Sequence, residues 1–129
     1  MKNCILFIFC FTFFSVYADG LPKDCIGHYA GEMPAYRVAK NDIEMNIEKQ
    51  DVHVQISSTH IYYKSGSLQL KGTYTYLKQS SSQILINADL SNGKNVSYKV
   101  DLVWDKKKST LYLAGKNGEP DITLEKLDN

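Results

Sequence analysis

Residues 68–76 have the sequence LQLKGTYTY, and this stretch decides the fold. Small, apolar or aromatic side chains occupy every second position, and polar side chains lie between them. Alternation with a period of two, in a segment rich in aromatic and β-branched residues, is typical of a β-strand with one buried face. A helix would distribute the same apolar positions around its circumference. We therefore predict a strand whose buried face carries Leu68, Leu70, Gly72, Tyr74 and Tyr76.

The segments before this strand repeat the alternation and can be joined to it as hairpins. A shift of one residue turns a strand inside out, so each hairpin must place apolar residues opposite one another. Turns centred on residues 49–50, 58–59 and 65–66 meet this condition. The first predicts Ile47 opposite Val52, the second predicts Ile56 opposite Ile61, and the last predicts Tyr63 opposite Leu68.

The same rule pairs the segments that follow. A loop over residues 78–82 sets Gly72 opposite Ala88, and a later turn sets Trp104 opposite Leu111. Both pairings keep the apolar positions on one side of the sheet, which extends the buried face towards the C-terminus.

Two Asn-Gly pairs mark further connections. Asn117-Gly118 predicts a tight hairpin, because both residues tolerate the positive φ angles of a type I′ turn. It sets Leu113 opposite Ile122 and Lys116 opposite Glu119. A tight turn at the other pair, Asn92-Gly93, would place apolar residues opposite polar ones. We predict a bulge or a five-residue connection there, with Leu90 opposite Val96 and Ala88 opposite Tyr98.

These pairings predict an all-β fold built as an antiparallel up-and-down meander of about eight to nine strands. Closing the meander into a small β-barrel, with residues 26–38 contributing, removes the two exposed edges. A flattened β-sandwich is the alternative. The expected strands are residues 43–48, 51–57, 60–64, 67–77, 83–90, 95–104, 109–114 and 120–127.

The first 18 residues are typical of a secretory signal peptide, with a lysine near the start, an apolar run and Val-Tyr-Ala at the end. We expect residues 19–25 to form a flexible leader and residues 26–129 a single barrel domain. The protein is therefore predicted to be secreted or periplasmic, without a transmembrane anchor after cleavage. Cleavage leaves Cys25 as the single cysteine, so the mature chain forms no internal disulfide. Asn95-Val96-Ser97 matches a glycosylation acceptor for a eukaryotic source.

Charge and motifs exclude several functions. Without Lys2 the chain has 14 basic and 14 acidic residues, since the whole sequence has 15 and 14, and this balance argues against nucleic-acid partners. No phosphate-binding loop or nucleophile motif is present, which favours a non-enzymatic role without a cofactor. We expect no metal site, because His53 and His60 are predicted about 13 Å apart on the outer face. His28 is expected to lie near neither.

In architecture the pattern resembles the lipocalin-like and fatty-acid-binding barrels, from residue 26 to the C-terminus. Gly27-His28-Tyr29 is similar to the glycine-any-tryptophan element at the start of lipocalin barrels, with tyrosine in place of tryptophan. The resemblance implies a small β-barrel that encloses an apolar ligand.

Two surfaces are candidates for binding. Small side chains in the inward row Gly72–Ala88–Tyr98 predict a notch for a small hydrophobic ligand, unless the interior side chains fill it. The residues expected around such a ligand are Tyr63, Gly72, Tyr74, Ala88, Tyr98 and Trp104. On the outer face, Leu85, Val103 and Tyr112 form an apolar patch suited to a protein partner, unless residues 26–36 cover it. The leading hypothesis is a ligand-binding barrel, and the alternative is a protein-binding or inhibitory module without a small ligand.

Overall fold

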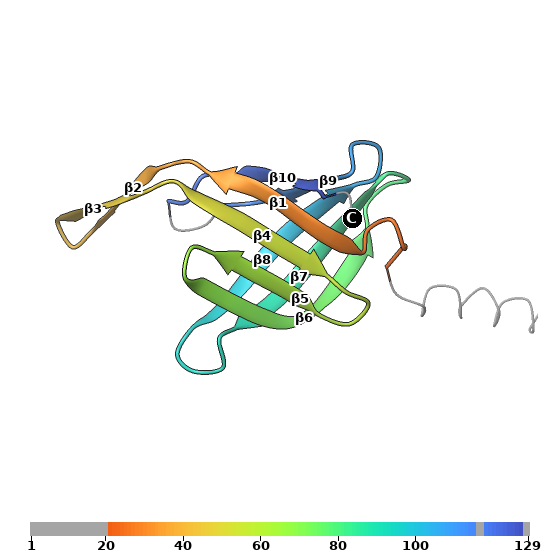
Figure 1. The fold of residues 1–129 in the computed structure, drawn as a ribbon, viewed down its shortest axis with the longest axis horizontal. Coiled ribbons are helices and arrows are strands. Elements are labelled where there is room, and N and C mark those ends of the chain that lie inside the picture. The colour runs from red at the N-terminus through yellow and green to blue at the C-terminus, as the bar shows by residue number, and fades with distance from the viewer. Residues whose placement is uncertain (1–20, 116–117, 128–129) are drawn as a thin grey trace, which may run out of the picture.

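The structure, a computed structural model, describes residues 21–115 and 118–127, and the predicted signal peptide lies outside this range. Figure 1 shows that the described chain is all β, and none of its segments is a helix long and apolar enough to cross a membrane. The strands are β1 (Gly27–Met33), β2 (Tyr36–Lys40), β3 (Ile43–Ile47), β4 (Gln50–Ile56), β5 (Ile61–Ser65), β6 (Leu68–Lys78), β7 (Gln83–Ser91), β8 (Ser97–Asp105), β9 (Thr110–Leu113) and β10 (Ile122–Lys126).

Eight strands close into a barrel in the order β1-β10-β9-β8-β7-β6-β5-β4, and each neighbouring pair is antiparallel. β1 closes the barrel, because it pairs with β4 along one edge and with β10 along the other. The predicted all-β meander and its closure into a barrel are therefore confirmed. Of the predicted closing segment, residues 26–38, residues 27–33 supply the closing strand, and residues 36–38 lie outside the barrel.

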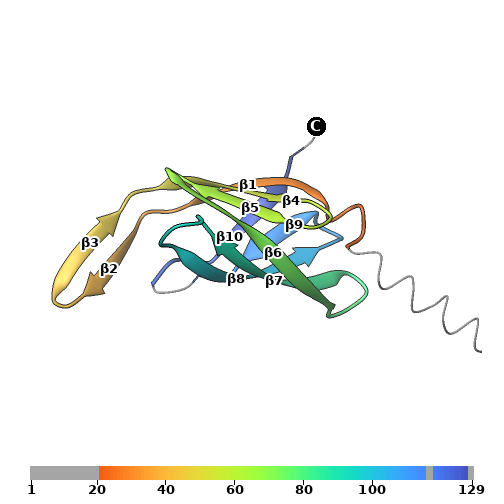
Figure 2. The same cartoon turned by 90° about the horizontal axis from the view of Figure 1, so that it is seen from below.

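The remaining two strands, β2 and β3, form a separate hairpin that we call the arm. In Figures 1 and 2 the arm extends beyond the barrel as a continuation of β1 and β4. The predicted turn at residues 49–50 is wrong, since Ile47 lies opposite Tyr36 on β2 instead of Val52 on β4. The chain reverses instead at Asn41 and Asp42, whose φ angles of 54° and 64° suit a two-residue hairpin turn.

Three predicted hairpin registers are confirmed: Ile56 with Ile61, Trp104 with Leu111, and Leu113 with Ile122. The first two join their strands as predicted. In the third, the pairing of Lys116 with Glu119 falls outside the described residues, and β9 already ends at Leu113.

Two registers are shifted by two residues. Tyr63 lies opposite Leu70 instead of Leu68, and Gly72 lies opposite Leu90 instead of Ala88. A shift of two residues keeps each side chain on the same side of the sheet, so the inward and outward directions survive. The prediction that Leu68 is buried is wrong, since it is 40% exposed at the start of β6. The β5–β6 turn uses Gly66 at its first position, with a φ of 59°, which is the pattern of a type II′ turn.

The predicted five-residue connection after β7 is confirmed, although Leu90 lies opposite Tyr98 instead of Val96. Asn92 organises this loop, because its Oδ1 accepts hydrogen bonds from the backbone N–H groups of Lys94, Asn95 and Val96. These bonds satisfy three donors that a tight turn would have placed in the ladder.

The core lies inside the barrel and is made by the alternating inward positions. These side chains form one apolar cluster, in which Ile86, Leu102, Leu111 and Leu124 are almost fully buried. Partly buried aromatic rings pack against the cluster: Tyr36, Tyr63, Tyr74, Tyr76 and Tyr98. Along this cluster the barrel is filled by its own side chains, as small barrels allow.

One end of the barrel, which we call the leader end, is covered by residues 21–26. Leu21 and Cys25 are buried there, although residues 19–25 were expected to be flexible. The Tyr29 hydroxyl donates to the Cys25 carbonyl at 2.7 Å, and Lys126 Nζ donates to the Asp24 carbonyl at 2.7 Å. These bonds fasten the leader to β1 and β10.

The buried thiol predicts a loss of stability in alkali. Burial raises the pKa of Cys25 from 9.0 to about 12. Because the folded state keeps this proton longer than the unfolded chain, the thiol has no effect below pH 9 and lowers stability as the pH rises towards 12. The maximum slope is about 1.4 kcal/mol per pH unit.

Urea denaturation of the wild type and Cys25→Ala at a series of pH values measures this slope. The wild type should lose stability more steeply above pH 9. Burial also raises the pKa of Tyr29 and Tyr98 above the usual 10.0, so both proteins share a further loss of the same sign above pH 10, and the slopes are compared between pH 9 and 10. Equal slopes in the two proteins would show that the thiol is not buried.

Candidate functional site

A pocket of about 220 Å³ opens at the leader end of the barrel. Three inward side chains reach it from neighbouring strands: Tyr76 from β6, Ile84 from β7 and Trp104 from β8. Pro22 of the leader, residues 80–82 of the β6–β7 loop, and the flanking residues Lys78, Gln83 and Lys106 complete the wall. The pocket is therefore aromatic and apolar on the barrel side and carries serine hydroxyls and two lysines at its loop side.

Local pairing holds these walls in place. Ile84 lies opposite Trp104 in the β7–β8 ladder, so both side chains point to the same side of the sheet. The loop is fixed at both ends, since Gln79 N–H donates to the Gln83 carbonyl and Lys106 N–H donates to the Ser82 carbonyl. Such bonds preform the pocket before any ligand arrives.

Trp104 has an unsatisfied polar group. Its side chain is buried, and Nε1 makes no hydrogen bond of normal geometry among the described residues. The Tyr29 oxygen, which donates its own proton to the Cys25 carbonyl, is near enough to interact with the indole N–H, but their contact falls short of hydrogen-bond geometry. A buried donor without an acceptor is costly, so an incoming acceptor at Trp104 would be favourable.

The structure separates the six residues predicted around a ligand. Trp104 lines the leader-end pocket, and Tyr74 donates to the Ser57 carbonyl at 2.8 Å. Tyr63 and Tyr98 interact with one another and with Glu119. Ala88 lies between these groups, opposite Tyr74 on β6. The six residues thus line different parts of the inner wall.

The predicted row Gly72–Ala88–Tyr98 does not form, because Gly72 faces Leu90 and Ala88 faces Val100. Gly72 also leaves no notch. A Cβ atom built there would lie 1.6 Å from the backbone oxygen of Asp89, so the β7 backbone already occupies that space. The glycine permits close approach of two backbones, which is a recognised use of glycine in strands.

The end of the barrel next to the arm is closed by a tyrosine cluster. Tyr98 Oη lies 3.1 and 3.2 Å from the two carboxylate oxygens of Glu119. Burial and this carboxylate raise the pKa of Tyr98, and the same two causes raise the pKa of Tyr36. Both phenols therefore stay protonated further into alkali than an exposed tyrosine, and Tyr98 keeps its hydrogen bond to Glu119 over that range.

The predicted outer patch is present as a row of neighbours. Leu85 lies opposite Val103, and Val103 lies opposite Tyr112. Residues 26–36 do not cover it, since β1 pairs with β4 and β10. Tyr112 is 39% exposed, while Leu85 and Val103 are half-buried. The patch thus presents one exposed ring above two partly shielded aliphatic side chains.

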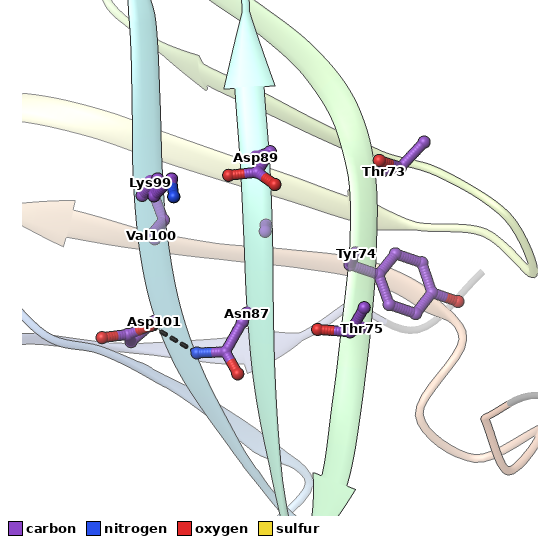
Figure 3. Close-up of a pocket in the computed structure, with 9 residues that line it drawn as sticks. Thr73, Tyr74, Thr75, Asn87, Asp89, Lys99, Val100 and Asp101 are labelled. Atoms are coloured by element: carbon purple, nitrogen blue, oxygen red, sulfur yellow. Dashed lines mark hydrogen bonds between the residues drawn. The ribbon is translucent and has the colours of Figure 1, made fainter.

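A polar groove of about 320 Å³ crosses the outer wall of β6, β7 and β8. Figure 3 shows Thr73, Thr75, Asp89 and Lys99 along it, with Asn87 Nδ2 donating to Asp101 Oδ1 at 2.6 Å. Carboxylate, amide and ammonium groups here alternate along neighbouring strands. This mixture is typical of a solvated sheet face, and the apolar part of the lining is limited to Tyr74, Ala88 and Val100.

The expectation that His28 lies near neither other histidine is wrong. The β1–β4 pairing brings His28 Nε2 to 3.3 Å from His53 Nδ1. The alternation of apolar and polar residues does not indicate that β1 pairs with β4, so it cannot predict that these side chains meet. Within residues 21–115 and 118–127, no group of three or more His, Cys, Asp and Glu side chains is placed to hold a metal ion.

Comparison with known proteins yields no match to a family profile, to a curated protein or to a solved structure.

Proposed function

We propose that the protein is a secreted or periplasmic, non-enzymatic binding protein that takes a small hydrophobic ligand at the leader end of its barrel. The observation that carries this proposal is the buried, unpartnered indole N–H of Trp104 beside a preformed apolar pocket. Residues 1–18, which have the pattern of a signal peptide, support export. The closed barrel supports an apolar ligand, because it resembles the lipocalin-like barrels, which enclose such ligands.

Pocket size limits the ligand. Pockets for drug-sized molecules measure roughly 300–1,000 Å³, and this one measures about 220 Å³. The ligand is therefore a single-ring or short-chain apolar molecule. One hydrogen-bond acceptor on it would match the Trp104 N–H, and the remaining surface would contact Tyr76, Ile84 and Pro22.

Trp104 is the single tryptophan of the chain, so its fluorescence reports on this pocket alone. We expect a saturable spectral shift with cyclohexanone and a weaker response to methylcyclohexane, which has the same ring without an acceptor. One neutral hydrogen bond predicts a difference in affinity of about twofold to tenfold.

A blocking variant tests the position of this site. Ser82→Phe should weaken cyclohexanone binding, because Ser82 lines the pocket. Ser58→Phe, at an exposed turn, should leave it unchanged. The proposal fails if neither ketone nor hydrocarbon gives a saturable response, or if both variants bind as the wild type does.

A second candidate function, protein binding, is favoured by the arm. Ile43 and Met45 are 63% and 56% exposed, which exceeds the exposure of Tyr112 in the outer patch. Directly opposite residues share a face, so Met45 lies beside Val38, and Glu44 and Arg37 point to the other face. An exposed apolar face of this kind marks a contact surface.

The partner that the chain itself can supply is a second copy, because two such faces are complementary under a two-fold axis. Light scattering coupled to size exclusion should then show a dimer for the wild type and for Glu44→Lys, and a monomer for Met45→Lys. A monomeric wild type would exclude self-association through the arm.

A further inference from the structure

A pair of histidines projects from the outer wall where the barrel closes. His28 on β1 faces Gln55, and His53 on β4 faces Ala30, so the two histidines are diagonal neighbours across the ladder. Their rings meet edge to face, with centroids 5.4 Å apart and planes at 66°. Both side chains are half-buried and line an outer groove of about 450 Å³.

The spacing of the facing nitrogens suits a shared metal ion. His28 Nε2 and His53 Nδ1 are 3.3 Å apart. If each nitrogen lies about 2.1 Å from one ion, this separation corresponds to an angle of roughly 104° at the metal, close to the tetrahedral value of about 109°. The two rings therefore already have the separation that a chelate requires.

The chemistry also fits, once one ring changes tautomer and both rings tilt to point their lone pairs at the ion. Without metal, the contact is a hydrogen bond, so one facing nitrogen carries a proton. Binding requires that each ring place its proton on the other nitrogen, His28 Nδ1 and His53 Nε2, which is a change of tautomer for one ring. Both rings remain neutral and present a lone pair to the ion.

We propose that His28 and His53 form a two-histidine site for a first-row divalent transition metal, with Cu²⁺ held more tightly than Zn²⁺. Imidazole ligands suit both ions, and the general order of affinity favours copper. The described residues add no third histidine or carboxylate to the pair, so the other coordination positions belong to water or to an external donor.

The neighbouring charge gives the site a signature. Lys64 lies opposite His53 and lines the same groove, so its ammonium group opposes a bound cation. Lys64→Gln should therefore strengthen metal binding. A stretch of polypeptide that bound metal without a defined site would not respond to this substitution.

The test is a titration of the untagged mature protein with Cu²⁺, followed by electron paramagnetic resonance, and with Zn²⁺, followed by calorimetry. The wild type should bind one ion, with two nitrogen ligands for copper. His28→Ala and His53→Ala should each weaken binding by more than the roughly 10–100-fold that outer-sphere substitutions cost.

His60→Ala is the matched control, because His60 lies at the turn between β4 and β5, and its Nδ1 contacts Thr59 Oγ1 at 2.8 Å. It should bind as the wild type does. The double variant His28→Ala/His53→Ala measures background binding by the terminal amine. Metal should also raise the melting temperature of the wild type and not that of the double variant, because the ion links β1 to β4. Equal binding by the wild type and both single variants would overturn the proposal.

Discussion

Replacement of Gly72 by alanine is expected to destabilise the protein by about 3 kcal/mol or more, or to prevent folding. The added Cβ would lie 1.6 Å from the Asp89 oxygen and 3.0 Å from the Leu90 Cα. Both atoms belong to the backbone of β7, so no rotation of a side chain can relieve the overlap. The two strands must separate at this point, which breaks the ladder between β7 and β6, the longest strand of the barrel.

Gly93→Ala provides the control. Gly93 has a φ of 79° and no atom within 4 Å of an added Cβ, so alanine there meets conformational strain alone. That strain costs roughly 1–2 kcal/mol. Urea denaturation of both variants measures the difference. A Gly72→Ala protein as stable as Gly93→Ala would mean that β6 and β7 do not approach as closely as described.

Leu102→Ala is expected to cost about 2–5 kcal/mol, and Val103→Ala less than about 1 kcal/mol. The two residues are adjacent on β8 but point in opposite directions. Leu102 is 1% exposed inside the barrel, where its removal leaves a cavity, and Val103 is half-buried on the outer wall. Thermal or urea denaturation resolves a difference of this size.

The comparison also tests the outer patch. If Val103→Ala proved as costly as Leu102→Ala, Val103 would belong to the core and the patch would not be a contact surface. A small cost would leave Leu85, Val103 and Tyr112 available to a partner.

The alternation of apolar and polar residues predicts well which side of the sheet each side chain occupies. It predicts less well which residues lie opposite one another on neighbouring strands. Every apolar residue of residues 68–76 was assigned to one face, and shifts of two residues in the neighbouring ladders left that assignment intact. Register depends on turn geometry, and a shift of one residue in the position of a turn changes which residues pair. The turn after β5 is placed by the positive φ of Gly66, and a turn centred one residue earlier satisfies the hydrophobic pattern equally well.

The candidate site was predicted only in part. Trp104 could be identified because it is a large inward aromatic residue. The pocket beside it also depends on Pro22 and on loop residues, which follow no alternating pattern that would predict their position. The histidine pair was missed for a similar reason, since it needs the pairing of β1 with β4 across the inserted arm. Contacts between segments distant in sequence produce little recognisable pattern in a single amino-acid sequence.

The closure of the barrel has a consequence for how the chain folds. One partner of β1 is β4, which is nearby in sequence. Its other partner is β10, so Tyr29 pairs with Lys126 although almost the whole domain separates them in sequence. Contacts of such high sequence separation slow folding, because the entropy of closing a long loop must be lost before the contact forms. During synthesis β10 emerges last, and until then β1 and β9 each present an open edge to other chains. The time that passes before β1 pairs with β10 therefore sets the period in which the nascent protein is most prone to aggregation.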